Sequence, residues 1–137
     1  MERIKKFFAE RDRFAKYCGM EIIDASSGGS RVRMPIREHH LNGMNTVHGG
    51  AIFSLADFAF ALACNSHGIV SVAVNTSITF VKAAVKGTLT AVAEENSVNP
   101  KLGSYTVRIT DDAGDLVAIF QGLAYRKKET LDDVLKK

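Results

Sequence analysis

Apolar side chains recur at a spacing of three or four residues near the start of the chain, at Ile4, Phe7, Phe8, Phe14 and Cys18. This spacing predicts one amphipathic helix over about residues 2–18, which ends at Gly19. Alternating apolar and polar residues follow, and this is the pattern of half-buried strands. Two short strands are therefore predicted at 20–25 and 31–36, with a turn at 26–29 between them.

The middle of the chain holds its longest apolar segment, at residues 51–67. We predict a long helix there, with Gly68 as its stop. The apolar side chains point in every direction around the helix, so it must be buried on several sides. The polar segment 38–46 before it contains Asn42-Gly43 and predicts an irregular loop.

β-branched residues dominate the rest of the chain, and we predict strands at 70–82, 87–97, 104–110 and 116–126. Turn-forming residues at 99–103 and 111–114 indicate hairpins, and hairpins join antiparallel strands. The fold class is therefore α+β, with an antiparallel sheet wrapped around a long central helix. We expect a single domain over residues 1–137, with its core at 20–126 and a charged tail at 127–137 that ends in a short helix or frays.

Composition narrows the class of protein. The chain has 137 residues, of which 46% are hydrophobic and 24% charged, and its net charge is +3. These values exclude a disordered chain, and the mild basic excess favours a phosphorylated ligand over nucleic acid. The apolar run 50–64 is shorter than the roughly 20 residues of a membrane span, and the first residues lack the apolar core of a signal peptide. We expect a soluble, cytoplasmic protein without a membrane partner.

The cysteines and histidines follow no metal-binding pattern. Cys18 and Cys64 are expected to be buried free thiols, because both fall in helical segments. His39 and His40 have no partner at the spacing of a known zinc motif. We expect a solvated loop pair and no metal site.

Asp57 is the only charged residue between His48 and His67. Its neighbours on the same helical face include Phe53 and Phe60. An ionised carboxylate in such surroundings is costly unless it is hydrogen-bonded or solvated. A structural hydrogen bond is one interpretation, and a catalytic base or nucleophile is the other. The apolar surroundings favour the second.

A second candidate group lies where the central helix begins, at His48, Gly49 and Gly50. Free backbone N–H groups at a helix start can stabilise an oxyanion, and glycines allow a substrate to come close. Gly49 and Asp57 are eight residues apart in the sequence, or about 12 Å along a helix, which is too far for one carbonyl to touch both. If the two cooperate, the helix start of one subunit must face Asp57 of a second subunit, as in a two-fold dimer.

The stretch from Asn42 to Asp57, NGMNTVHGGAIFSLAD, resembles the hotdog-fold acyl-CoA thioesterases, and most closely their PaaI type of phenylacetic acid degradation. Residues 58–68 and 74–80 extend the resemblance. It implies a hotdog fold, dimers whose sheets join and that pair into homotetramers, and hydrolysis of an acyl-CoA thioester whose acyl group is aromatic in the PaaI type. It implies no metal and no cofactor, since coenzyme A is part of the substrate.

The resemblance also implies roles for individual residues. Asp57 corresponds to the catalytic carboxylate, acting as base or nucleophile across the dimer interface, and Gly49 to the oxyanion donor. His48 and Asn42 fall on positions that orient the thioester and the attacking water, and Gly50 lies beside them as a substrate-binding residue.

Some relatives carry a hydroxyl residue in the strand after the helix, at a position that falls on Ala73 here. Strand alternation places Asn75 and Ser77 on the face of Ala73, so we expect one of them to substitute. The phosphates of coenzyme A favour cations, and the basic residues available for this are Lys82, Arg126, Lys127 and Lys128.

Two other functions use the same fold. Fold alone does not settle function. A non-catalytic acyl-CoA-binding or regulatory protein is one alternative, and it would bind ligand without turnover. A hotdog enoyl-CoA hydratase would use a carboxylate and a histidine on an enoyl substrate. Thiol release measured beside enoyl hydration separates these alternatives.

Overall fold

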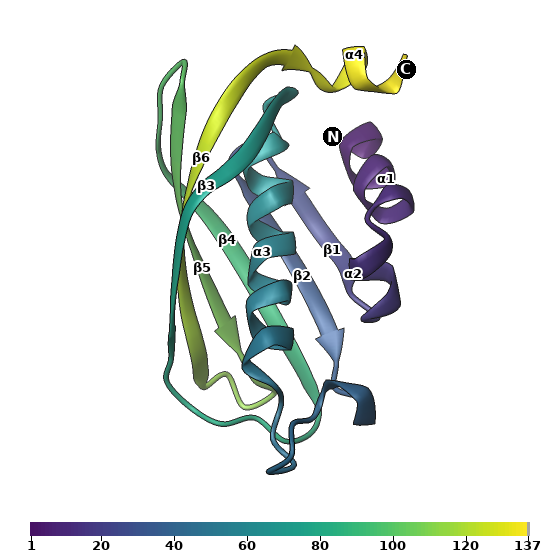
Figure 1. Ribbon diagram of the computed structural model, residues 1–137, viewed down its shortest axis with the longest axis vertical. Coiled ribbons are helices and arrows are strands. Elements are labelled where there is room, and N and C mark those ends of the chain that lie inside the picture. The colour runs from purple at the N-terminus through teal and green to yellow at the C-terminus, as the bar shows by residue number, and fades with distance from the viewer. Residues whose placement is uncertain (137) are drawn as a thin grey trace.

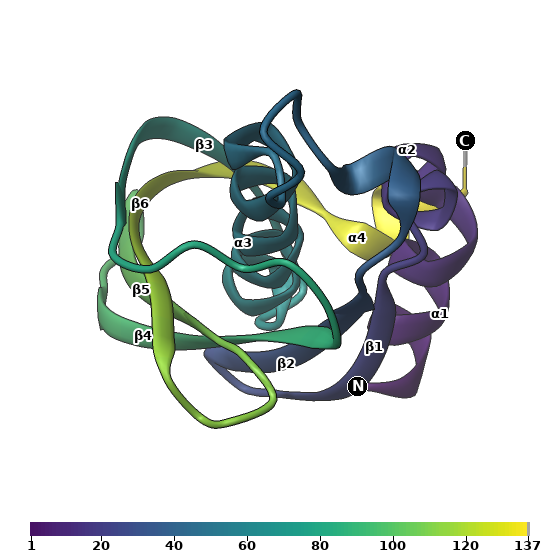
Figure 2. The same cartoon turned by 90° about the horizontal axis from the view of Figure 1, so that it is seen from below.

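The computed structural model describes residues 1–136, and its strands form one antiparallel sheet that curves around a long helix (Figures 1 and 2). The helices are α1 (Glu2–Arg11), α2 (Arg13–Tyr17), the 3-10 helix η1 (Glu38–His40), α3 (Gly49–Asn65) and α4 (Leu131–Leu135). The strands are β1 (Glu21–Ser26), β2 (Gly29–Pro35), β3 (Ile69–Phe80), β4 (Thr88–Val98), β5 (Leu102–Thr110) and β6 (Leu116–Thr130). The strand order is β1-β2-β4-β5-β6-β3. The predicted α+β fold is confirmed.

The core lies between α3 and the concave face of the sheet. Leu55, Leu62 and Phe60 of α3 are almost fully buried against strand residues such as Val107 and Phe120. Gly122 of β6 makes room for this packing, because a Cβ atom there would lie 2.7 Å from the Phe60 ring.

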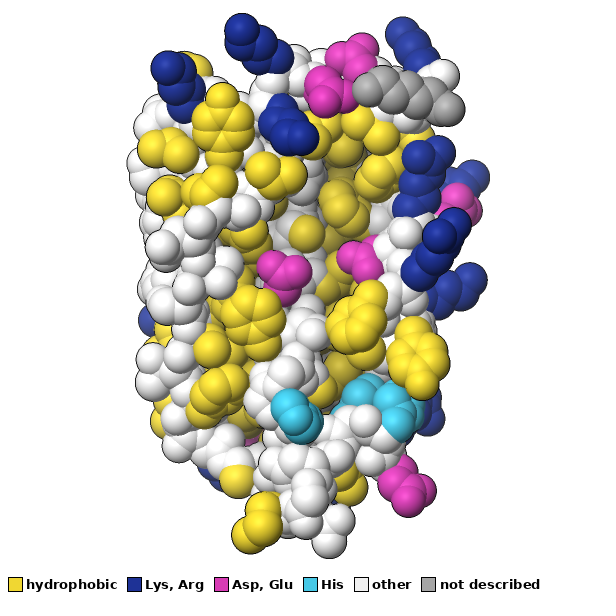
Figure 3. Space-filling view, viewed as in Figure 1, with side chains coloured by type: hydrophobic (Ala, Val, Ile, Leu, Met, Phe, Trp, Pro, Cys, Tyr) yellow, Lys and Arg dark blue, Asp and Glu magenta, His cyan; other side chains and the backbone are white. Residues whose placement is uncertain are grey.

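One side of α3 is not covered by the sheet. After the first turn, its half-buried residues are Phe53, Ser54, Asp57 and Ala61, which recur at helical spacing and therefore form one stripe. Figure 3 shows this face, where apolar side chains predominate and isolated carboxylates lie near the middle. The sheet thus satisfies only part of the burial that the sequence of this helix requires.

The N-terminal segment differs from the predicted single helix. It breaks at Asp12, where α1 ends and α2 begins. The Asp12 Oδ1 atom accepts a hydrogen bond of 3.0 Å from the Ala15 backbone N–H and so caps α2. The prediction was wrong at this point because a side chain that bonds to the nearby backbone competes with helix continuation. Both short helices lie beside α3 on the side of β1 (Figure 1).

The C-terminal boundary also differs. β6 runs to Thr130 and pairs there with Ile69, so residues 127–130 belong to the sheet and not to a tail. Leu131, which begins α4, is buried, and its N–H donates to the Gly68 carbonyl at 2.9 Å. The predicted short terminal helix is present. The charged residues 127–130 gave no sign of a strand in the sequence. They extend β6 past the end of its pairing with β5, and positions with one free edge tolerate lysines.

Other expectations are met within a few residues. The first two strands and the long helix are found close to their predicted positions, and both cysteines are buried and free. Among residues 1–136, no helix is long and apolar enough to cross a membrane.

Candidate active site

The start of α3 presents one free backbone donor. His48 caps the helix, and its Nδ1 atom accepts a hydrogen bond of 2.8 Å from the Gly50 N–H. The Gly49 N–H has no hydrogen-bond partner within residues 1–136. First-turn N–H groups of a helix have no intrahelical acceptor and carry the positive end of the dipole. Of the two glycines, Gly49 is thus the one whose amide is available to a ligand.

The loop before this helix is held by Asn42. Its Oδ1 atom accepts from the Met44 and Thr46 backbone N–H groups at 2.9 and 3.2 Å, and its Nδ2 donates to Thr46 Oγ1 at 3.0 Å. The loop turns through Asn45, whose φ is 59°. In this chain the Asn42 side chain therefore fixes the loop that leads into His48.

A hollow of about 380 Å³ lies beside Gly49 and is lined by Val47, Gly49, Ile52, Phe80, Val81, Lys82 and Ala83. The Phe80 ring comes within 3.1 Å of where a Cβ atom on Gly49 would be, so only glycine fits without a shift of the ring. Lys82 Nζ is bound to both Asp111 and Asp115 at 2.7 Å. Its charge is already balanced by these two carboxylates.

Asp57 lines a different hollow of about 290 Å³, together with Asp12, Phe14, Ala15, Met20, Phe53, Ser54 and Phe58. The carboxylate of Asp57 is half-buried and makes no hydrogen bond or ion pair with any described residue. Burial raises its pKa, and the negative charge of Asp12 raises it further. An ionised Asp57 is therefore a stronger base than an ordinary aspartate.

The two hollows are separate within one chain. They share no lining residue, and both lie along the same helix. Because α3 is helical throughout from Gly49 to Asp57, the separation of about 12 Å expected along the helix holds in the folded chain.

The side chains of β3 do not lie as alternation predicts. Ala73 pairs with Ala124, but Asn75 pairs with Leu123, because a bulge interrupts the register between them. Directly opposite residues share a face of the sheet, and Ala124 is on the buried, α3 side. The expectation that Asn75 and Ser77 lie on the face of Ala73 is therefore wrong.

Beyond the bulge, the hydroxyl residue of β3 on the α3 side is Thr76. It pairs with Gly122, whose missing side chain would point at Phe60 of α3. Thr76 could not be identified from the sequence. A one-residue bulge moves every following side chain to the opposite face of the sheet, and the sequence gives no clear signal of the bulge. Asp12 was missed as well, because it falls inside the single helix predicted over residues 2–18.

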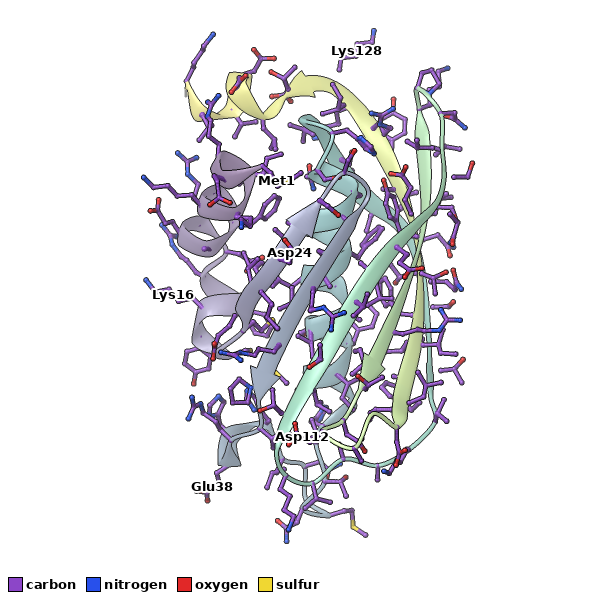
Figure 4. The ribbon with its side chains drawn as sticks, turned by 180° about the vertical axis from the view of Figure 1, so that it is seen from behind. Met1, Lys16, Asp24, Glu38, Asp112 and Lys128 are labelled. Atoms are coloured by element: carbon purple, nitrogen blue, oxygen red, sulfur yellow. The ribbon has the colours of Figure 1, made fainter. Side chains whose placement is uncertain are left out.

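The remaining predicted residues lie elsewhere. Arg126 Nη1 donates to the Asn99 carbonyl at 2.9 Å. Figure 4 shows Lys128 at one end of the sheet and Asp112 at the other. Asp112 follows Asp111 in the sequence, and Asp111 is one of the two carboxylates that bind Lys82. Within one chain, the structure does not bring Lys82 and Lys128 together.

His39 is exposed, as expected, but His40 is not. His40 is 2% exposed, its Nδ1 accepts from the Arg37 N–H at 2.9 Å, and its Nε2 lies 2.8 Å from the Cys18 carbonyl oxygen. Burial lowers its pKa. No group of three or more His, Cys, Asp or Glu side chains in the described part of the chain could hold a metal ion.

Known proteins share both sequence and structure with this chain. Residues 44–118 match the family described as the Thioesterase superfamily. The acyl-coenzyme A thioesterase PaaI of Escherichia coli is 40% identical over 118 residues, which cover 85% of this chain and 84% of that protein.

Two solved structures extend the comparison. The structure of the E. coli PaaI protein from the phenylacetic acid degradation operon superimposes with a TM-score of 0.91 at 37% identity and covers 94% of each chain. A variant of the phenylacetic acid degradation protein PaaI from Thermus thermophilus superimposes with a TM-score of 0.82 at 32% identity, covering 85% of this chain and 100% of that one.

Proposed function

The chain belongs to the hotdog thioesterase superfamily and is of the PaaI type, and on this premise we propose that it hydrolyses acyl-CoA thioesters at a site shared between two subunits. The observation that supports this most strongly is the pairing of two incomplete half-sites on one helix. One half-site holds a free amide at Gly49 and no base, and the other holds an unpartnered carboxylate at Asp57 and no oxyanion donor among the described residues.

In the proposed reaction, the substrate carbonyl lies against the Gly49 N–H of one subunit and faces Asp57 of the other. Asp57 acts as base or nucleophile. As a base it takes a proton from water, whose oxygen then attacks the carbonyl carbon. The negative charge that develops on the carbonyl oxygen is stabilised by the Gly49 amide and the helix dipole. The C–S bond then breaks, the acid leaves with the water oxygen, and the proton passes to the sulfur of coenzyme A.

A second copy of the chain is part of this proposal. β3 is an edge strand of the sheet and exposes Val72, Val74 and Phe80, of which Val74 is 56% exposed. An exposed apolar edge beside an uncovered helix face favours association with a further strand and helix. We propose a homodimer with joined sheets as the catalytic unit, and a homotetramer as the assembled form.

We further propose that the acyl group lies in the Asp57 hollow. Phe14, Phe53, Phe58 and Met20 give this hollow an aromatic and apolar lining, which suits an aromatic acyl group such as phenylacetyl. The coenzyme A moiety then extends over the Gly49 half-site of the partner, toward cations at the surface. No metal and no further cofactor enter the proposed reaction.

Thiol release from a panel of acyl-CoAs tests this proposal directly. We expect free coenzyme A from phenylacetyl-CoA, with kcat/KM about tenfold higher than for acetyl-CoA, since burial of an aromatic ring adds binding energy that acetyl cannot supply. Release is measured continuously with a thiol-detecting reagent. Absence of release from every acyl-CoA in the panel contradicts the proposed function, whereas equal values for the two substrates contradict only the aromatic preference.

The pH dependence of kcat/KM provides a second test. Asp57 must be ionised to act, and its pKa is raised by burial and by Asp12. Activity is therefore expected above this raised pKa and is lost as pH falls through it, so the acidic limb should lie above the ordinary aspartate value of about 3.9. Initial rates over a range of buffers locate the limb. A profile that stays flat down to about pH 4 would show that no base with a raised pKa is needed.

A further inference from the structure

The Asp57 hollow contains a second carboxylate. Asp12 comes from the break between α1 and α2, is half-buried, and lines the same hollow as Asp57. Only its Oδ1 atom has a hydrogen-bond donor among the described residues, the Ala15 N–H. The break between α1 and α2 thus places a negatively charged side chain of the N-terminal segment in the half-site on α3.

No cation among the described residues lines this hollow. Its remaining members are apolar except for Ser54, whose hydroxyl donates to the Gly50 carbonyl at 2.7 Å. The adjoining hollow between α1 and β1, which shares Asp12 with this one, is lined by four cations, Lys5, Lys6, Lys16 and Arg37. None of these four forms an ion pair with Asp12, and none lines the Asp57 hollow. A group bound in the Asp57 hollow therefore meets two carboxylates and no cation in its lining.

We infer that Asp12 is a specificity-determining residue that excludes acyl groups carrying a negative charge. This inference rests on the proposed function, because it takes the acyl group to lie in the Asp57 hollow. A terminal carboxylate on the acyl chain would enter an apolar space as a third negative charge, and like charges in poorly solvated surroundings repel strongly. Neutral acyl groups, aromatic or aliphatic, meet no such barrier. The substrate class is therefore that of uncharged acyl-CoAs.

The charge of Asp12 can be separated from its structural role. Asparagine caps helices about as well as aspartate, so Asp12→Asn removes the charge and keeps the cap of α2. Asp12→Ser is a second capping variant that changes the shape of the side chain as well. Glu10→Gln is the matched control, because Glu10 is an exposed carboxylate of α1 that lines neither hollow.

The experiment compares glutaryl-CoA, which ends in a carboxylate, with valeryl-CoA, which has the same chain length without the charge. For each protein the readout is the ratio of kcat/KM on glutaryl-CoA to kcat/KM on valeryl-CoA. We expect Asp12→Asn and Asp12→Ser to raise this ratio at least about tenfold, because removing one unit charge from within about 12 Å, at an effective dielectric constant of ~20, changes the ratio by a factor of about ten or more. Glu10→Gln should leave the ratio unchanged.

The possible outcomes are distinct. A tenfold rise confined to the Asp12 variants supports the inference, and an unchanged ratio overturns it. An equal rise in Glu10→Gln also overturns it, because the effect then comes from the net charge of the protein and not from the hollow. If the unaltered protein hydrolyses valeryl-CoA and the ratio does not move, only this inference fails. If it hydrolyses no acyl-CoA, the proposed function fails and the inference fails with it.

Discussion

Asp57→Asn is expected to lower kcat for acyl-CoA hydrolysis by about 10³-fold, within the range that a general base contributes. Asparagine has nearly the same shape as aspartate but can neither accept the proton of water nor attack the carbonyl carbon. KM should change little, because the apolar walls of the hollow remain in place. The measurement is thiol release from the best substrate of the panel, with the variant at a concentration high enough to detect the residual rate.

The melting temperature of Asp57→Asn is the control that shows whether this variant is folded. The pKa of Asp57 is raised in the folded protein, so the folded state binds a proton here more readily than the unfolded state does. The contribution of Asp57 to stability is therefore present at low pH and is lost as pH rises through the raised pKa. At neutral pH the ionised side chain disfavours folding, and Asp57→Asn should melt at the same or a higher temperature. Retention of most of the activity in a folded Asp57→Asn protein would refute the assigned role.

Gly49→Val is expected to lower kcat by about 10²- to 10³-fold, the typical effect of losing one oxyanion donor. The valine side chain would project toward the Phe80 ring, which already lies 3.1 Å from the position of a Cβ atom. It would also keep the substrate carbonyl away from the Gly49 N–H. The matched control is Gly43→Val, because a Cβ atom on Gly43 meets nothing within 4 Å.

Mixing the two inactive proteins tests the shared site. In a dimer of one Asp57→Asn subunit and one Gly49→Val subunit, one site combines an intact Gly49 with an intact Asp57, and the other site carries both changes. Random exchange places about half of the subunits in mixed dimers, so about one quarter of the original activity should return. The subunits are mixed under conditions that allow exchange, and thiol release is followed over time. If exchange is demonstrated and no activity returns, each chain must hold a complete site of its own.

The chemistry-bearing residues of α3 could be found in the sequence because they are local. A lone carboxylate among apolar residues is recognisable in the sequence, and His-Gly-Gly before an apolar run indicates the start of a helix. Their separation along the helix also follows from sequence, since the rise per residue is constant. The local pattern does not distinguish Gly49 from Gly50. The resemblance to the thioesterases assigns the oxyanion donor to Gly49, and in the structure the His48 ring occupies the Gly50 amide.

Predictions from the sequence were wrong where tertiary contacts override a local pattern. The bulge in β3 places Thr76, and not Asn75 or Ser77, on the side of α3, because its pairing with β6 is interrupted beside Ala73. Lys82 has the charge to bind a phosphate, yet two aspartates from the β5–β6 connection already hold it.

The α+β class, most of the helices and strands, and the lone carboxylate on the central helix could be predicted from the sequence, because hydrophobic periodicity and helix-breaking residues act over a few residues. The folded arrangement determines which side chains line the same hollow. It set Asp12 of the N-terminal segment beside Asp57 and left one stripe of α3 uncovered. Such contacts depend on how distant segments pack and pair, and no local pattern records them.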